Sequence, residues 1–224
     1  MTLKAQARAF SSTLARILNK TVTRGISLQV ILDREQGGRV VGWLGYQVSR
    51  SNLVGQPIPL TVSPAPPSSY LWIGQTLMVE EDTGHLVTRS AQVALCTDPD
   101  GEDQLFRYDY NREPSNDYPA AHLQVYGLNQ PWLDFCAARG YAKPTERLHF
   151  PVGGRRFRPS LEDIVEFLIV EKLVSFHDAW QEGLAEGRQR WDAVQVMAAV
   201  RARPADAAEQ LRQLGYAVDA PQPS

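Results

Sequence analysis

The sharpest change of pattern in this sequence falls at residues 148–173, where strand-like segments give way to an almost wholly helical remainder. Turn residues follow the apolar run 148–150, which is typical of the end of a strand. Ser160 is a favourable N-cap residue and Asp163 completes a capping box, so a helix is predicted to begin at Leu161. Its apolar residues have the spacing of one buried helical face: Leu161, Ile164, Val165, Leu168 and Ile169. We expect this helix to pack on a sheet formed by the preceding residues.

Strand patterns separated by turn residues occupy most of the chain before this helix. They fall at residues 26–33, 39–48, 70–80, 86–96, 104–110 and 121–126. Residues 56–69 contain five prolines, which predicts a loop or an edge instead of a central strand. Short connections between the later strands favour antiparallel pairing. The sequence therefore predicts an α+β fold, in which an antiparallel β-sheet over about residues 26–150 is packed by an N-terminal helix and by the helix from Leu161.

Helical patterns flank the predicted sheet. Amphipathic spacing over residues 3–18 indicates the N-terminal helix. This acid-free basic segment also fits a mitochondrial presequence, but the strand pattern that follows closely favours an ordinary first helix. A short helix is expected near residues 131–139, a long one over 178–203 and a last one from Pro204. Gly183, one of two glycines a turn apart in the long helix, either allows close approach of a neighbouring element or marks a helix break.

The chain is predicted to divide into an α+β sheet domain at 1–175 and a helical extension at 176–220. We expect the extension to bind a partner protein or to form a homo-oligomer. No apolar run approaches the roughly 18 residues of a membrane span, so no membrane association is expected. Cys96 and Cys136 are too few and too far apart for a disulfide scaffold or a metal knuckle, which fits a reducing, cytoplasmic environment. Common nucleotide-binding, hydrolase and zinc-site motifs are absent, and neither a metal nor a cofactor is expected.

Charge is distributed unevenly, although the formal net charge is only −2. Residues 139–158, named the basic hinge below, carry one acidic residue and six basic ones: Arg139, Lys143, Arg147, Arg155, Arg156 and Arg158. The last of these lie just before a predicted helix N-terminus, where backbone N–H groups also attract anions. We therefore predict that the basic hinge binds nucleic acid or another anion, or an acidic partner protein. Residues 79–117 carry ten acidic residues against three basic ones, so ion pairs between the two regions are the alternative.

Histidines, tyrosines and an arginine on neighbouring predicted strands form a candidate catalytic group. Alternation along a strand puts Arg107 and Asp109 on one side and Tyr108 on the other. Only one set can share a face with His122, whose imidazole could act as general acid or base while a guanidinium group holds a phosphodiester. The candidate catalytic residues are His122, His149 and Tyr108. The alternative is that the histidines are partly buried strand residues, that Tyr108 packs on the sheet, and that Arg107 pairs with a local carboxylate.

Three segments together are similar to a pattern found among uncharacterised bacterial proteins, some of them linked with toxin–antitoxin or defence loci, and the small TumE-type toxins share its general form. They are FRYDY at 106–110, PAAHLQVY at 119–126 and LHFPVGGRRFRPSLEDIVEFLI at 148–169. The resemblance covers about residues 104–170 and consists of a tyrosine-rich strand, a histidine-bearing strand and a terminal helix. It implies a bacterial, cytosolic protein of a defence or toxin–antitoxin type, in which the N-terminal sheet and the C-terminal helices are additions. TumE-type toxins are shorter and richer in histidine around the second strand, where this chain has only His122.

The sequence leaves three functions open. The first is a non-catalytic component of a bacterial defence or toxin–antitoxin module, which binds nucleic acid or an acidic protein through the basic hinge. The second is a metal-independent ribonuclease toxin that uses His122 or His149 with the arginines. The third is an interaction scaffold whose ligand is purely protein. Salt dependence separates them, because phosphate contacts release counterions and therefore weaken as the salt concentration rises.

Overall fold

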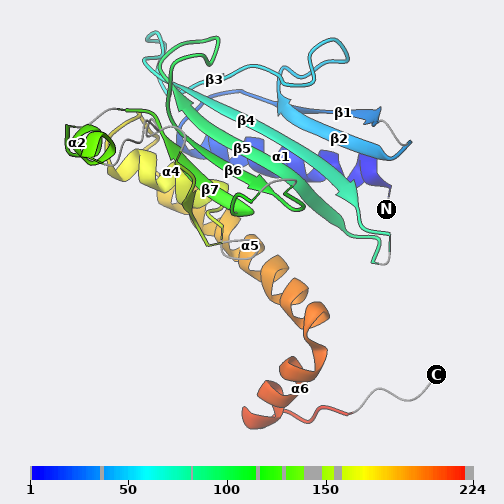
Figure 1. Cartoon of the computed structure of the whole chain (residues 1–224). Helices are drawn as coiled ribbons and strands as arrows, with labels where there is room; N and C mark the ends of the chain where they lie inside the picture. Colours follow the sequence, from blue (N-terminus) through cyan, green and yellow to red (C-terminus); the bar gives the residue numbers. More distant parts are fainter. Residues whose placement is uncertain are drawn as a thin grey trace. The chain divides into compact units, whose positions relative to one another are not determined.

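The chain forms one antiparallel sheet and a set of helices in the computed structural model (Figure 1). The structure describes residues 2–35, 38–81, 83–114, 117–127, 130–138, 148–153 and 158–219. The helices within these ranges are α1 (Leu3–Thr21), α2 (Gln130–Ala138), α4 (Leu161–Val170), α5 (Trp180–Ala202) and α6 (Pro204–Gln213). The strands are β1 (Leu28–Arg34), β2 (Val40–Tyr46), β3 (Ile58–Pro59), β4 (Tyr70–Val79), β5 (Leu86–Cys96), β6 (Gln104–Asn111), β7 (Ala121–Val125) and β8 (Phe150–Pro151). These elements confirm the predicted α+β fold.

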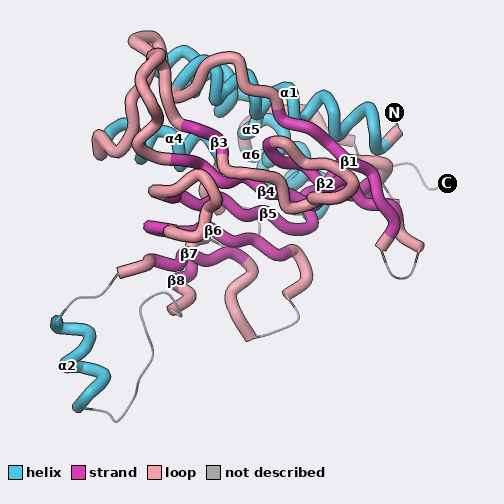
Figure 2. The backbone as a smooth tube through the Cα atoms, turned by 90° about the horizontal axis from the view of Figure 1, so that it is seen from above, coloured by secondary structure: helices cyan, strands magenta, loops and turns pink. Residues whose placement is uncertain are grey.

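The sheet is antiparallel at every pairing of the described strands. Its order is β1-β2-β4-β5-β6-β7-β8, so nearly all neighbours in space are also neighbours along the chain (Figure 2). The two-residue β3 pairs with β4 off this path. It comes from the proline-rich segment 56–69, whose prolines cannot donate to a ladder of hydrogen bonds. That segment therefore contributes no central strand, as predicted.

Helices α1 and α4 cover one side of the sheet, called the helix face here, and leave the other side as the open face (Figure 1). Leu18 of α1, Leu168 of α4 and Leu71 of β4 are all fully buried in the same core. The five residues predicted to form the apolar face of α4 are all buried. The capping box is also present: the hydroxyl of Ser160 accepts from the backbone N–H of Asp163 at 3.2 Å, and the Asp163 carboxylate accepts from the backbone N–H of Ser160 at 2.9 Å. Local capping and the apolar stripe therefore agree on where α4 begins and which side it buries.

Strand β6 shows how the two faces differ. Phe106 is buried on the helix face, and Tyr108 packs against the same core. Arg107 and Asp109 point the other way and line a pocket on the open face. This division follows from the two-residue period of a strand.

The chain divides into two compact units, Met1–Leu184 and Ala185–Ser224. Leu184 is only 1% exposed and belongs to the core of the first unit. Gly183 also lies in that unit, and a Cβ atom added there would be 2.9 Å from the Cβ of Lys20 in α1. The predicted close approach at this glycine is therefore confirmed, whereas the division at residues 175 and 176 stays a prediction. Among the described residues, no helix is both long and apolar enough to cross a membrane.

Candidate functional site

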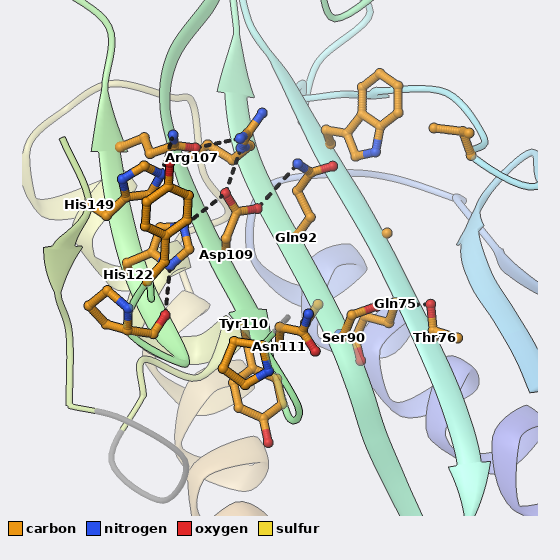
Figure 3. Close-up of a pocket in the computed structure, with 18 of the residues that line it drawn as sticks. Gln75, Thr76, Ser90, Gln92, Arg107, Asp109, Tyr110, Asn111, His122 and His149 are labelled. Carbon is orange, nitrogen blue, oxygen red and sulfur yellow. Dashed lines mark hydrogen bonds and ion pairs between the residues drawn. The ribbon is translucent and has the colours of Figure 1, made fainter. Parts of the chain in front are cut away.

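A pocket of about 440 Å³ lies on the open face of the sheet (Figure 3). One side of it carries polar and titratable groups, which we name the histidine side: Arg107, Asp109, His122, Gln124 and His149. The other side carries two indoles and two aliphatic side chains, which we name the tryptophan side: Trp43, Leu53, Val54 and Trp72. A volume in this range and a mixture of apolar walls with a few converging polar groups are typical of small-ligand sites.

Strand register brings the histidine side together. Asp109 of β6 pairs with His122 of β7, and Arg107 pairs with Gln124. Directly paired residues of an antiparallel sheet project from the same face, with Cβ atoms about 5 Å apart. Residues two apart along each strand also share that face. Two strands thus place two neighbouring rows of polar side chains on the open face.

Hydrogen bonds join the side chains of these rows into a network. The Arg107 Nε donates to Asp109 Oδ2 at 2.8 Å, and its Nη2 donates to the side-chain carbonyl of Gln124. On the neighbouring strand β5, Gln92 Nε2 donates to Asp109 Oδ1 at 3.2 Å. The predicted pairing of Arg107 with a local carboxylate is confirmed. Because Asp109 is anchored by two donors, its carboxylate is held in one orientation beside His122.

His122 is oriented by two groups at its two ring nitrogens. Its Nδ1 lies 2.9 Å from the carbonyl oxygen of Pro119, and a carbonyl oxygen can only accept, so Nδ1 carries a proton. Its Nε2 lies 3.6 Å from Asp109 Oδ2, which is beyond hydrogen-bonding distance. The side chain is 13% exposed. Nε2 therefore faces the Asp109 carboxylate without a hydrogen bond that commits it to that group.

His149 is oriented by a hydrogen bond with Gln124. Its Nε2 lies 3.3 Å from the amide nitrogen of Gln124. Arg107 can only donate, so it holds the Gln124 carbonyl and turns the Gln124 amide nitrogen toward His149. The amide nitrogen donates, and His149 Nε2 must therefore accept with its lone pair, which only a neutral imidazole provides at that atom. The His149 ring also stacks on Tyr118, with centroids 3.6 Å apart and planes at 18°.

The two histidine rings are in contact with each other. Their centroids lie 4.6 Å apart with an interplanar angle of 74°, and Figure 3 shows both rings beside Asp109. Two adjoining imidazoles can supply a proton acceptor and a proton donor at the same site. The guanidinium of Arg107 adds a positive group that binds anions. Together these groups suit proton transfer around a bound anion such as a phosphodiester.

Tyr108, predicted as a third catalytic residue, does not join this group. It lies on the helix face, where its ring meets Phe106 edge-on at 5.8 Å, because alternation turns it away from Arg107 and Asp109. Burial raises the pKa of Tyr108 above its ordinary value. The structure thus brings together His122 and His149 but leaves Tyr108 on the other side of the sheet.

Of the six basic residues of the basic hinge, only Arg158 lies within the described residues. Its guanidinium carbon sits 4.0 Å from the ring centroid of Tyr110, in a cation–π arrangement. Burial is the main cause that lowers the pKa of Arg158. The remaining hinge residues lie outside the described residues: Arg139, Lys143, Arg147, Arg155 and Arg156. The anion-binding role of the hinge stays a prediction.

Several groups of the pocket were not anticipated from the sequence. Gln124 orients His149, and its position two residues after His122 on one strand is a signal that could have found it. Tyr118 precedes the strand in a loop, where no periodicity predicts a direction. Trp43 and Trp72 come from strands that are far away in sequence, so only the sheet order brings them to this pocket. In the described part of the chain, no group of three or more His, Cys, Asp or Glu residues is placed to hold a metal ion.

The sequence resemblance to TumE-type toxins covers about residues 104–170. In the structure this stretch supplies β6, β7 and β8 of the sheet and α4 of the helix face, and its histidines form the pocket's histidine side. The family relationship stays a prediction. Comparisons of the chain with protein-family models, with curated proteins and with solved structures find no match.

Proposed function

We propose that this chain is a metal-independent ribonuclease that cleaves single-stranded RNA at the histidine side of the pocket, as the toxin of a bacterial toxin–antitoxin or defence module. One observation carries the proposal: His122 and His149 touch each other in complementary hydrogen-bonding states beside Arg107. Two imidazoles of this kind supply an acid and a base, and a guanidinium supplies charge for a phosphate.

In the proposed reaction, His149 accepts the proton of a ribose 2′-hydroxyl as the 2′-oxygen attacks the adjacent phosphorus. The bond from the 2′-oxygen to phosphorus forms, and the bond from phosphorus to the 5′-oxygen of the next nucleotide breaks. His122, as the imidazolium, donates its Nε2 proton to that leaving 5′-oxygen. The products are a 2′,3′-cyclic phosphate and a free 5′-hydroxyl, and the two histidines exchange protonation states. Arg107 stabilises the negative charge on the non-bridging phosphate oxygens.

The proposed roles follow from the hydrogen bonds of each ring. The base needs a lone pair, and His149 Nε2 has one that accepts from the Gln124 amide nitrogen at 3.3 Å. The incoming 2′-hydroxyl must displace this hydrogen bond before His149 takes its proton. The acid needs a transferable proton, and His122 Nε2 lies too far from Asp109 to be committed to it. Asp109 is then a positioning residue, whose carboxylate faces His122 Nε2 without touching the substrate.

The test is cleavage of an end-labelled single-stranded RNA by the purified chain in excess EDTA. We expect fragments that end in a 2′,3′-cyclic phosphate. His122→Ala and His149→Ala should each slow cleavage by about 100-fold or more, which is the usual contribution of a general acid or base. His85→Ala is the matched control, because His85 is exposed in the connection between β4 and β5 and does not line the pocket.

Melting temperatures of the same variants separate catalysis from folding. Loss of cleavage with an unchanged melting temperature supports the proposal. Wild-type protein that leaves the RNA intact contradicts it, as does full activity of either pocket variant. Activity that disappears in EDTA contradicts the metal-independent mechanism.

A non-catalytic nucleic-acid-binding component is a second candidate, favoured by one observation. Gln92, Arg107, Asp109 and Gln124 already satisfy one another in the network, as side chains of a purely structural or binding site would. This function predicts RNA binding that weakens as salt rises, without any cleavage. Arg107→Gln should then weaken binding, whereas alanine at either histidine should leave most of it.

A further inference from the structure

The tryptophan side of the pocket plays no part in the proposed acid–base chemistry. Trp43 of β2 and Trp72 of β4 are both partly exposed and line the pocket together with Leu53 and Val54. Half-exposed indoles on an open sheet face are a large apolar surface beside a polar cluster. A ligand that fills the whole pocket therefore needs an apolar, planar part and a charged part.

Small residues make room between the two sides. Gly74 of β4 pairs with Gln92 of β5, which pairs with Asp109, and this row of the sheet has no side chain at its Gly74 position. In the next row, Trp72 pairs with Ala94, which pairs with Arg107. The row positions of Trp72 and Arg107 are thus two strand spacings apart, or about 9.5 Å. This span is comparable with the distance from a nucleobase to a phosphate of the same or the next nucleotide.

The ring of Trp72 is held in place from behind. A Cβ atom added at Gly101 would come within 2.4 Å and 2.6 Å of two carbons of the Trp72 ring, so the backbone of Gly101 lies directly against the indole. Gly101 has φ +76°, a conformation that glycine adopts without strain. A ring fixed before binding loses little conformational freedom when a ligand stacks on it.

We infer that the tryptophan side binds a nucleobase of a single-stranded nucleic acid whose phosphate lies at Arg107. The inference rests on the proposed function, which places the phosphate there. Base stacking on aromatic side chains and a cationic group for the backbone are the two elements of single-strand recognition. The pocket offers both on one rigid sheet face, and Gly74 leaves the floor between them open. The expected substrate is therefore unpaired, because a base inside a duplex cannot reach the indoles.

The test compares two fluorescein-labelled DNA oligonucleotides of equal length, an oligothymidylate and the same backbone with abasic sites. Neither carries the 2′-hydroxyl needed for cleavage, so binding is measured alone. At one fixed salt concentration, the oligothymidylate should bind roughly 5- to 150-fold more tightly, the range that a single stacked base contributes. Trp43→Leu should reduce this preference, while Arg107→Gln should weaken binding of both oligonucleotides alike.

Gly74→Val tests the same inference without removing any group. A Cβ at Gly74 would make only an ordinary 3.5 Å contact with Trp72 Nε1, and valine favours a strand, so folding should be kept while the floor is filled. We expect Gly74→Val to abolish the preference for intact bases. Gly127→Val is the matched control, because a Cβ at Gly127 meets nothing within 4 Å and Gly127 does not line the pocket.

The outcomes separate this inference from the proposed function. Equal binding of both oligonucleotides overturns the inference, and RNA cleavage that continues in that case leaves the ribonuclease standing. A preference for intact bases that Gly74→Val removes supports the inference, even where no RNA is cleaved. Binding of neither oligonucleotide overturns the inference, and if RNA also stays intact the proposed function fails with it.

Discussion

The helix face and the open face of the sheet are built from the same strands but are used differently. On β6, Phe106 is buried under the helices, while Arg107 and Asp109 line the pocket. The helix face is apolar and closely packed, whereas the open face on this strand holds an ion pair and hydrogen bonds. Because side chains alternate along a strand, neighbouring residues of β6 contribute either to the core or to the pocket.

The comparison teaches that stability and chemistry can be changed separately in this molecule. Burial of apolar area on the helix face supplies most of the folding free energy, because that area is removed from water. Partly exposed polar groups on the open face contribute little to it. Substitutions on the helix face should therefore change unfolding, and substitutions on the open face should change binding or cleavage.

The largest expected effect comes from the helix face. Ile73 of β4 is 1% exposed in the core, next to Trp72, which lines the pocket. Ile73→Ala should lower the free energy of unfolding by about 2–5 kcal/mol, since it removes buried methyl groups and leaves a cavity. Urea unfolding followed by circular dichroism measures the change, with Gly74→Val as the neighbour that faces the pocket. A loss below about 1 kcal/mol would argue against the described core, because truncation at a filled core site costs more than this.

A smaller effect on stability is expected when Arg158 is replaced. Arg158→Gln removes the cation above the Tyr110 ring and should lower the free energy of unfolding by about 0.5–2 kcal/mol. Binding of single-stranded nucleic acid should keep its salt dependence, because Arg158 stacks on the Tyr110 ring and does not line the pocket. Arg107→Gln is the matched variant on the open face, and it should reduce the slope of log affinity against log salt by about 0.7.

The opposite result would reassign Arg158. If Arg158→Gln reduced the salt slope as much as Arg107→Gln does, Arg158 would contact phosphate, as the basic hinge was predicted to do. The two arginines would then act on one ligand.

The fold was predictable because its signals are local. Ser160, Asp163 and the apolar stripe after them mark where α4 begins and what it buries, and alternation marks the strands. The same alternation predicted that only one set of residues on β6 could share a face with His122. Which set it would be was not predictable, because the choice depends on the register between β6 and β7 and on the side that the helices cover.

The pocket itself was predictable only in part. His122 and His149 were recognised by their chemistry, but their contact depends on pairing between β7 and β8, which are separated by many residues. Trp43 and Trp72 carry no motif, and strand order alone brings them near the histidines. Long-range pairing is set by the whole sheet and not by any short segment, so a site assembled from five strands leaves little trace in the sequence.

Tyr108→Phe should have the smallest effect and tests the comparison most directly. Tyr108 lies between Arg107 and Asp109 along the chain, yet it packs on the helix face, where the phenyl ring is kept by the substitution. Stability should change by less than about 1 kcal/mol, the usual scale of one side-chain hydroxyl, and the rate of RNA cleavage should not change. The measurement is the cleavage rate of Tyr108→Phe beside that of His122→Ala, with melting temperatures of both. A large loss of cleavage at an unchanged melting temperature would return Tyr108 to the catalytic group and would mean that the two faces of β6 are not separate in function.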